Sequence, residues 1–187
     1  MKAPLIVLRN RKASTGEFRV AAEAIAEILA KEALRRMRKE KVTDASKVIL
    51  VPVLRAGLAL LPAFMKKFPE APVGFIGLKR NEKTLKPKAY YQNIPKISKS
   101  DKVIVLDPML ATGGSAVTAI TALIKDGAQE KNITFVGVIS APEGFLKLQT
   151  SFPQIDMLVA VHDEKLDKKG YIIPGLGDFG DRYFGTK

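Results

Sequence analysis

The 187-residue sequence contains no cysteine and only one histidine. Without cysteine, the chain has no disulfide, no thiolate zinc site and no cysteine nucleophile. The single histidine, His162, is followed by Asp163 and Glu164, which leaves a metal ligand or a general base as one interpretation. Because a metal site needs several converging ligands, we expect His162 to be an incidental residue at the surface or at a strand edge.

Long apolar runs are also missing. None approaches the roughly 20 residues that a membrane-spanning helix needs. In the N-terminal stretch, MKAPLIVLRNRK, charged residues come too early for the apolar core of a signal peptide. We therefore expect a cytoplasmic protein without a membrane segment. No internal repeat or low-complexity linker divides the chain, so its length predicts one domain, residues 1–187.

Acidic residues are outnumbered by basic ones. The chain has 31 lysines and arginines against 19 acids, which gives a formal net charge of +12. Such a charge favours a polyanionic partner, either nucleic acid or a small phosphate-rich ligand. The lysines are spread over the whole chain, so we expect most of them to serve solubility. The basic segment 35–41 is expected to be a solvated helix end, where cations suit the helix dipole, with an RNA-binding arm as the alternative.

Short apolar, β-branched runs alternate with helical patterns along the chain. Ser14 and Glu17 form a capping box, which predicts that a helix begins near Ser14. The order of the elements predicts an α/β fold with a mostly parallel central sheet and flanking helices. Strands are predicted at residues 47–53, 73–78, 103–106, 133–139 and 157–161, and further helices at residues 58–68, 112–127 and 145–152.

One predicted strand ends in an acid and leads through a glycine-rich turn into a helix, in the stretch KVIVLDPMLATGGS at residues 102–115. Backbone N–H groups of such a turn and the helix N-terminus attract phosphate. No lysine follows Gly114, so this is not a P-loop, and a G-x-G-x-x-G dinucleotide motif is absent as well. The spacing between Asp107 and residues 112–115 suits a ribose 5-phosphate, with the phosphate in the turn and the sugar hydroxyls near Asp107.

Three other segments are candidates for the same site. Arg55, with small residues after it at the end of a buried strand, either donates two hydrogen bonds to a diphosphate or is a surface residue of a turn. Residues 79–95 show no clear period and are either a flap over an active site, with Arg80 as its most useful cation, or a solvated excursion or hairpin. The glycine-rich stretch IIPGLGDFGD, at residues 172–181, is either a ligand-binding loop or a packed C-terminal loop.

Taken together and in order, these motifs resemble the type I phosphoribosyltransferases and, within them, the uracil phosphoribosyltransferases. The resemblance covers residues 48–187. It rests on VPVLRAGLAL, GLKRNEKTLKPKAYYQNIP, VIVLDPMLATGGS, SAPEG and GYIIPGLGDFGDRYFGTK. Asp107 and Pro108 are informative because most relatives have two adjacent acids there, whereas the uracil-specific enzymes have Asp-Pro.

The resemblance implies that the phosphoribosyl group of 5-phosphoribosyl 1-diphosphate is transferred to uracil, giving UMP and diphosphate. The catalytic residues that it implies are Asp107, Arg55 and Asp178. The donor-binding residues that it implies are Arg55, Arg80, Asp107, Pro108, Met109, Leu110, Ala111, Thr112, Gly113, Gly114, Ser115 and Asp178. The uracil-binding residues that it implies are Ile172, Gly177, Asp178 and Phe179. Magnesium would arrive bound to the donor's diphosphate, without a direct protein ligand.

Within the one domain, the helical pattern predicts an N-terminal helical segment (1–46), and the resemblance implies a flexible flap (79–95) and a base-binding tail (162–187). It implies a homo-oligomer, a dimer or higher, and a possible GTP activator. Many relatives have a longer segment, including a dimer arm, where this chain has only about residues 41–46. Two alternatives remain: a nucleotide-sensing, RNA-binding regulator with the same fold, and a phosphoribosyltransferase for another base. A nucleic-acid partner is otherwise not expected.

Overall fold

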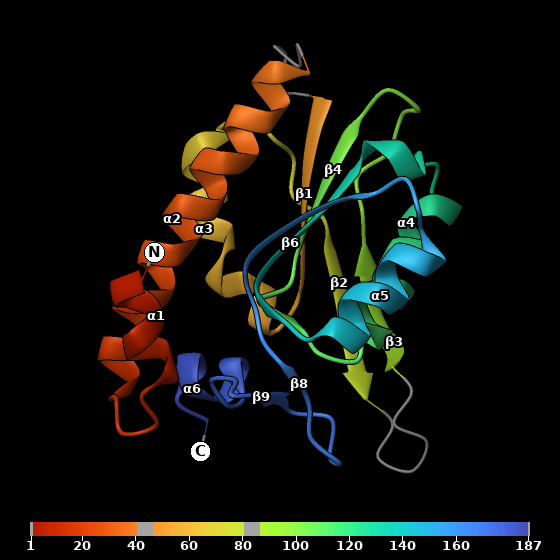
Figure 1. The fold of residues 1–187 in the computed structure, drawn as a ribbon. Helices are drawn as coiled ribbons and strands as arrows, with labels where there is room; N and C mark the ends of the chain where they lie inside the picture. The colour runs from red at the N-terminus through yellow and green to blue at the C-terminus, as the bar shows by residue number, and fades with distance from the viewer. Residues whose placement is uncertain (1, 41–46, 81–86, 187) are drawn as a thin grey trace.

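A seven-stranded sheet with helices on both faces forms the centre of the protein (Figure 1). The computed structural model describes residues 2–40, 47–80 and 87–186, although not the side chain of Arg80. The elements within these ranges are α1 (Lys2–Arg9), α2 (Thr15–Lys39), β1 (Val48–Leu54), η2 (Ala56–Ala59), α3 (Leu61–Lys67), β2 (Phe75–Arg80), β3 (Pro87–Asn93), β4 (Lys102–Leu106), β5 (Met109–Leu110), α4 (Gly114–Lys125), η3 (Glu130–Asn132), β6 (Ile133–Ser140), α5 (Pro142–Ser151), β7 (Asp156–His162), β8 (Lys165–Leu166), β9 (Ile172–Ile173) and α6 (Phe179–Phe184).

The sheet is mostly parallel, which confirms the predicted α/β class. Its strand order is β3-β2-β1-β4-β6-β5, and β7 also pairs with β6. Only the β2–β3 pair is antiparallel; the other ladders of this sheet are parallel. Every residue of β6, and all of β1 except its last, is buried, as expected for strands covered on both faces. The carboxyl ends of these strands point toward β8, β9 and α6 (Figure 1).

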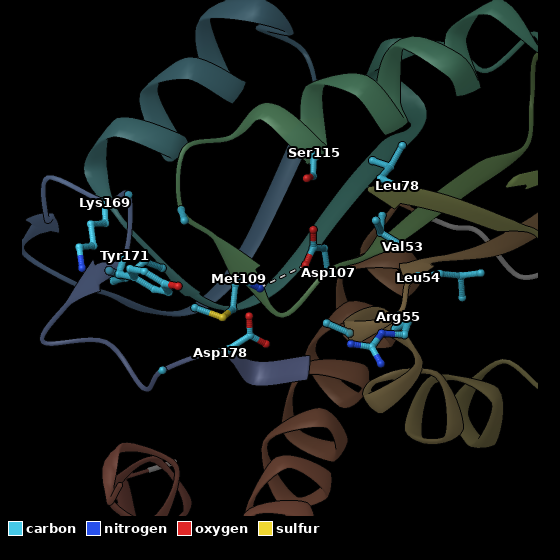
Figure 2. Close-up of a pocket in the computed structure, with 15 residues that line it drawn as sticks. Val53, Leu54, Arg55, Leu78, Asp107, Met109, Ser115, Lys169, Tyr171 and Asp178 are labelled. Carbon is cyan, nitrogen blue, oxygen red and sulfur yellow. Dashed lines mark hydrogen bonds between the residues drawn. The ribbon is translucent and has the colours of Figure 1, made fainter. Parts of the chain in front are cut away.

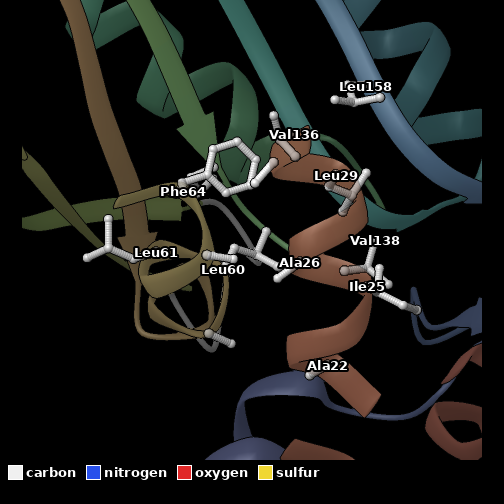
Figure 3. Close-up of a cluster of buried hydrophobic side chains, with 14 of the residues drawn as sticks. Ala22, Ile25, Ala26, Leu29, Leu60, Leu61, Phe64, Val136, Val138 and Leu158 are labelled. Carbon is white, nitrogen blue, oxygen red and sulfur yellow. The ribbon is translucent and has the colours of Figure 1, made fainter. Parts of the chain in front are cut away.

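The core on one face is formed by α2 packed across α3 and the sheet (Figure 3). Figure 3 shows Ile25 and Leu29 of α2 next to the strand residues Val136, Val138 and Leu158. These positions on α2 recur at helical spacing, so one face of the helix is apolar along its length. The other face of the sheet is covered by α4 and α5, which bury Ala116, Ala119, Ile120, Leu123 and Leu148.

The predicted capping box at the start of α2 is confirmed. Ser14 is the N-cap residue, and its hydroxyl accepts a hydrogen bond from the Glu17 backbone N–H at 3.2 Å. The Glu17 carboxylate in turn accepts from the Ser14 backbone N–H at 2.7 Å. Both bonds satisfy donors that a helix start leaves without a partner, which fixes where α2 begins.

The short elements are where the structure and the sequence prediction differ most. Residues 87–93, where no period is visible, form β3, an exposed edge strand whose antiparallel pairing with β2 agrees with the hairpin alternative for this segment. The stretch read as a single helix at residues 58–68 is divided into η2 and α3. Helix α1 lies within the predicted N-terminal helical segment but before the helix start predicted at Ser14, and the C-terminal helix α6 lies in a segment without a helical period. Of the helices within the described ranges, none is long and apolar enough to span a bilayer.

Candidate active site

A cavity of about 430 Å³ opens at the carboxyl ends of the parallel strands (Figure 2). In open α/β sheets, ligands bind at this edge. The cavity has three kinds of wall: the ends of β1, β2 and β4, the turn before α4, and the C-terminal tail. Its lining residues are Val53, Leu54, Arg55, Ala56, Leu78, Asp107, Met109, Ala111, Ser115, Lys169, Gly170, Tyr171, Ile172, Gly177 and Asp178.

Asp107 lies at the centre of this lining, directly after β4 (Figure 2). Its carboxylate accepts a hydrogen bond from the Met109 backbone N–H at 3.3 Å. Burial raises the pKa of Asp107 to about 7, and the Met109 hydrogen bond opposes that rise only in part. A carboxyl group removed from water in a cavity gains from a ligand that hydrogen-bonds to it or neutralises it, which is why such groups often mark functional sites.

The turn that precedes α4 has a tightly constrained backbone. Gly113 is the N-cap of α4 and has a φ of +74°, in the left-handed region that glycine tolerates best. Gly144, from the SAPEG motif, packs so closely against this turn that a Cβ there would lie 2.3 Å from the Ala111 carbonyl oxygen. Of the predicted donor-binding residues in this turn, Met109, Ala111 and Ser115 line the cavity, whereas Pro108, Leu110, Thr112, Gly113 and Gly114 do not belong to its lining.

Arg55 reaches the cavity from the end of β1, as the sequence suggested. Its side chain is 56% exposed, and Nη2 lies 3.4 Å from Oδ1 of Asp181. Behind it, the backbone approaches closely, because a Cβ on Gly57 would lie 2.2 Å from the Leu106 carbonyl oxygen. Only glycine fits there, so Gly57 allows η2 to pack against the end of β4.

The predicted flap corresponds in part to the β2–β3 hairpin. At the backbone, Arg80 pairs with Pro87, and the register shifts between Gly77 and Leu78. Leu78 contributes to the cavity lining from β2. The side chain of Arg80 and residues 81–86 lie outside the described residues, so the donor contact predicted for Arg80 and the closing of the flap stay predictions.

The C-terminal tail provides one wall of the cavity. Three of the predicted uracil-binding residues, Ile172, Gly177 and Asp178, line it. Asp178 is also the N-cap of α6, and its Oδ1 accepts from the Asp181 backbone N–H at 2.9 Å. The Phe179 side chain is fully buried instead, in an edge-to-face contact with Phe18 at 5.1 Å between ring centroids. From Phe179, only the backbone is therefore available for a contact with a ligand.

Sequence reasoning missed the turn at residues 169–171. Lys169, Gly170 and Tyr171 line the cavity, and a Cβ on Gly170 would lie 3.5 Å from Cγ2 of Thr112. This turn therefore lies against the predicted phosphate turn. This turn connects β8 and β9, which form a short antiparallel hairpin. Because each strand has only two residues, the sequence shows no alternation that would have predicted the hairpin.

His162 and the basic segment 35–41 are the two remaining candidates from the sequence, and both make contacts within the chain. His162 Nδ1 lies 2.7 Å from the hydroxyl of the buried Ser140, and no group of three or more possible metal ligands occurs among the described residues. In the basic segment, Arg35 and Arg36 pair with Glu32, and Arg36 also pairs with Asp156. Two cations of the segment thus have acidic partners within the chain.

Comparison with known proteins identifies close relatives along the whole sequence. The sequence profile described as uracil phosphoribosyltransferase matches residues 1–186. The uracil phosphoribosyltransferase of Clostridium acetobutylicum is 45% identical over 196 residues, which cover 98% of this chain and 93% of that protein. The enzyme of the same name from Limosilactobacillus fermentum is 42% identical with the same coverage.

Solved structures with a similar fold include one of similar sequence and one of more distant sequence. The AQ2163 protein from Aquifex aeolicus matches with a TM-score of 0.88 and 33% identity, over 100% of this chain and 94% of that chain. A purine phosphoribosyltransferase from Pyrococcus horikoshii matches with a TM-score of 0.55 at 18% identity, over 75% of this chain and 84% of that chain. The second match concerns the fold alone, which is that of the type I phosphoribosyltransferases.

Proposed function

This chain belongs to the uracil phosphoribosyltransferase family, and we propose that it transfers the phosphoribosyl group of 5-phosphoribosyl 1-diphosphate to uracil, giving UMP and diphosphate. The observation that carries the proposal is a single cavity in which Arg55, Asp107, Ser115 and the tail residue Asp178 meet. These residues come from segments far apart in the sequence. Each would bind one part of the two substrates. Arg55 would bind the diphosphate and Asp107 the ribose. Ser115 would bind the 5-phosphate and Asp178 the base.

The backbone of the tail selects the base. Uracil presents an acceptor, a donor and a second acceptor along one edge, and peptide N–H and C=O groups complement that pattern. Gly177 has a φ of +85°, which turns the backbone sharply at the cavity wall. Cytosine reverses two of the three positions and would leave buried groups without partners, and such sites reject an analogue by about 10⁴–10⁵.

In the reaction, the bond between C1 of the ribose and the diphosphate oxygen breaks, and a bond from C1 to N1 of uracil forms. Positive charge develops on the sugar ring as the diphosphate leaves, so the carboxylates of Asp107 and Asp178 stabilise it. Arg55 attracts the departing diphosphate. Asp178 lies on the base-binding wall and accepts the proton that N1 loses.

The donor's diphosphate would carry a magnesium ion, which would neutralise part of its negative charge. The cavity suits such a complex, because Arg55 can neutralise diphosphate charge that the metal leaves and the complex needs no direct protein ligand. The flap of residues 79–95 closes over the donor and keeps water from competing with uracil for the activated sugar.

A panel of acceptor bases tests this function. With 5-phosphoribosyl 1-diphosphate and magnesium in excess, diphosphate release is measured for uracil, cytosine, adenine and hypoxanthine, and the nucleotide product is identified. Release with uracil alone, together with UMP, is the expected result. Equal turnover of a purine would contradict the base assignment, and no turnover of any base would contradict the enzyme assignment.

Three further properties follow from the family and need their own measurements. GTP is a candidate activator, which is tested by adding it at a donor concentration below KM. Assembly into a dimer or a larger oligomer is tested by light scattering of the purified protein. A cytoplasmic location is tested by fractionating the source cells.

A further inference from the structure

An ion pair between the two ends of the chain lies directly behind the tail. Arg9, the last residue of α1, donates to both carboxylate oxygens of Asp163, which follows β7; the Nη1–Oδ2 distance is 2.9 Å. The Asp163 side chain is only 2% exposed. Its backbone N–H donates to the Ser140 carbonyl at the end of β6, at 2.8 Å. The carboxylate is therefore fixed to the central sheet.

The same two side chains hold one residue of the tail from both sides. The Gly175 backbone N–H donates to Oδ2 of Asp163 at 2.7 Å, and the Gly175 carbonyl accepts from Nη1 of Arg9 at 3.1 Å. Gly175 has a φ of +62°, and a Cβ there would lie 2.0 Å from the Ile172 carbonyl oxygen. The chain at this point thus has little freedom to move in any direction.

A second arginine fixes the next residue. Arg182 of α6 donates from Nη1 to the Leu176 carbonyl at 2.6 Å and from Nη2 to the Asn10 carbonyl at 2.7 Å. It also donates to the Leu8 carbonyl. Hydrogen bonds therefore tie two successive tail residues to the end of α1. The next two residues along the chain, Gly177 and Asp178, line the cavity.

We propose that Arg9 and Asp163 are positioning residues for base recognition. They fix Gly175, so that the backbone that follows it in the tail lies where its N–H and C=O groups can hydrogen-bond to the edge of the base. This inference rests on the proposed function. Neither residue belongs to the cavity lining, so both act through the tail. A binding pattern made of backbone groups depends on where the backbone lies, and a displacement of about 1 Å costs about 100-fold in such sites.

The position of the Arg9–Asp163 pair also predicts which of the two substrates binds more weakly when the pair is lost. Arg55 and Asp107 directly follow β1 and β4, and Ser115 lies in the first turn of α4, so these residues are attached to the sheet and to a helix that packs on it. The tail residues instead come from a segment whose two-residue strands pair only with each other. Loss of the pair should therefore weaken the binding of uracil, not that of the donor.

The test uses Arg9→Met, Arg9→Lys and Asp163→Asn in the full chain. The control is Arg36→Met, because Arg36 also forms an ion pair with strand β7. Its partner Asp156 lies at the opposite end of that strand, outside the cavity lining, and its side chain is 40% exposed. For folded variants, we expect KM for uracil to rise at least about tenfold and KM for the donor to change less than about twofold. Arg9→Lys should recover only part of the loss, because an ammonium group lacks the planar fork of arginine.

Hydrogen exchange of the Gly175 amide provides a readout that does not depend on activity. We expect it to exchange faster in Arg9→Met than in wild type or in Arg36→Met. An unchanged uracil KM in the folded variants, or an equal rise for both substrates, would overturn the inference, as would the same loss in the control. If wild type fails to turn over uracil, the proposed function fails; unchanged Gly175 exchange in Arg9→Met would then refute the positioning of the tail separately.

Discussion

The guanidinium of Arg55 and the carboxylate of Asp181 meet at 3.4 Å at the edge of the cavity, although 126 residues separate them in the chain. Cζ of Arg55 also lies 5.8 Å from the centroid of the Phe184 ring. The first arginine implied as a donor contact thus rests on α6, the helix that follows the base-binding wall. An exposed pair of this kind contributes little to stability, so Arg55 can turn toward a diphosphate at small cost.

Arg55→Ala should lower kcat/KM for the donor by about 100-fold or more and leave the melting temperature almost unchanged, because the lost contacts are solvated. Arg19→Ala is the matched control. Arg19 also contacts α6, through the Tyr183 carbonyl at 2.7 Å and the Tyr183 ring, but it does not belong to the cavity lining. Steady-state kinetics and thermal unfolding of both variants check this, and wild-type kinetics in Arg55→Ala would remove its assigned role.

Asp107→Asn should lower the catalytic activity but raise the stability of the folded protein at alkaline pH. Burial raises the pKa of Asp107 from 3.8 to about 7, so in this pH range the folded protein holds a proton that the unfolded chain releases. The carboxyl group therefore destabilises the fold increasingly from about pH 4 to about pH 7, and by a constant amount above that.

Asparagine removes this penalty. At about pH 8 the variant should be more stable than wild type, by an amount on the order of 2–4 kcal/mol, and the two should converge toward about pH 4. Its kcat/KM should nevertheless fall by about 100-fold. Urea unfolding at both pH values, combined with kinetics, decides this, and a variant that is less stable than wild type at pH 8 would contradict the raised pKa.

Gly144→Ala should destabilise the protein by about 2–4 kcal/mol and raise KM for the donor, because its Cβ would meet the Ala111 carbonyl oxygen at 2.3 Å and displace the phosphate turn. Gly16→Ala, in the first turn of α2, is the control. There the nearest atom to a new Cβ is the Ser14 hydroxyl at 4.0 Å, so we expect a change within about 1 kcal/mol. Equal stability of the two variants would show that the backbone contact is not tight.

Lys169→Met should raise KM for the donor several-fold. Lys169 lines the cavity on the turn that lies against Thr112, so its ammonium group can reach an anionic ligand in the phosphate turn. Lys168→Met removes the same charge from the neighbouring position, which is exposed and not in the lining, and should have little effect. Donor titrations at two salt concentrations distinguish the two variants, and equal effects would point to net charge alone.

Where the chain has strong periodicity, the sequence predicted the structure well. The buried strands β1, β4 and β6 are continuous apolar runs, and α2 has an apolar face and a capping box, so local composition was sufficient. The short β5, β8 and β9, and the exposed β3, lacked such a pattern. A two-residue strand or a solvated edge strand has no alternation to detect.

The candidate site was predicted only in part, for a related reason. Asp107, Arg55 and the phosphate turn follow buried strands, where the ends of a parallel sheet meet, so their proximity follows from the fold class. Lys169 and Tyr171 reach the cavity because an irregular tail folds back over it. Phe179, which the resemblance implied as a uracil contact, packs its side chain on Phe18 in the core, so that contact stays a prediction for its backbone alone.

By itself, then, the sequence determined the class of fold and the glycine-rich turn with the acid before it, because these depend on neighbours within one short stretch. Only the tertiary structure decided how the tail is held. Arg9 and Asp163 are 154 residues apart, and no local pattern links them. They meet because the end of β7 and the end of α1 reach the same place behind Gly175, where a buried carboxylate needs a cation and backbone donors to compensate for its lost hydration.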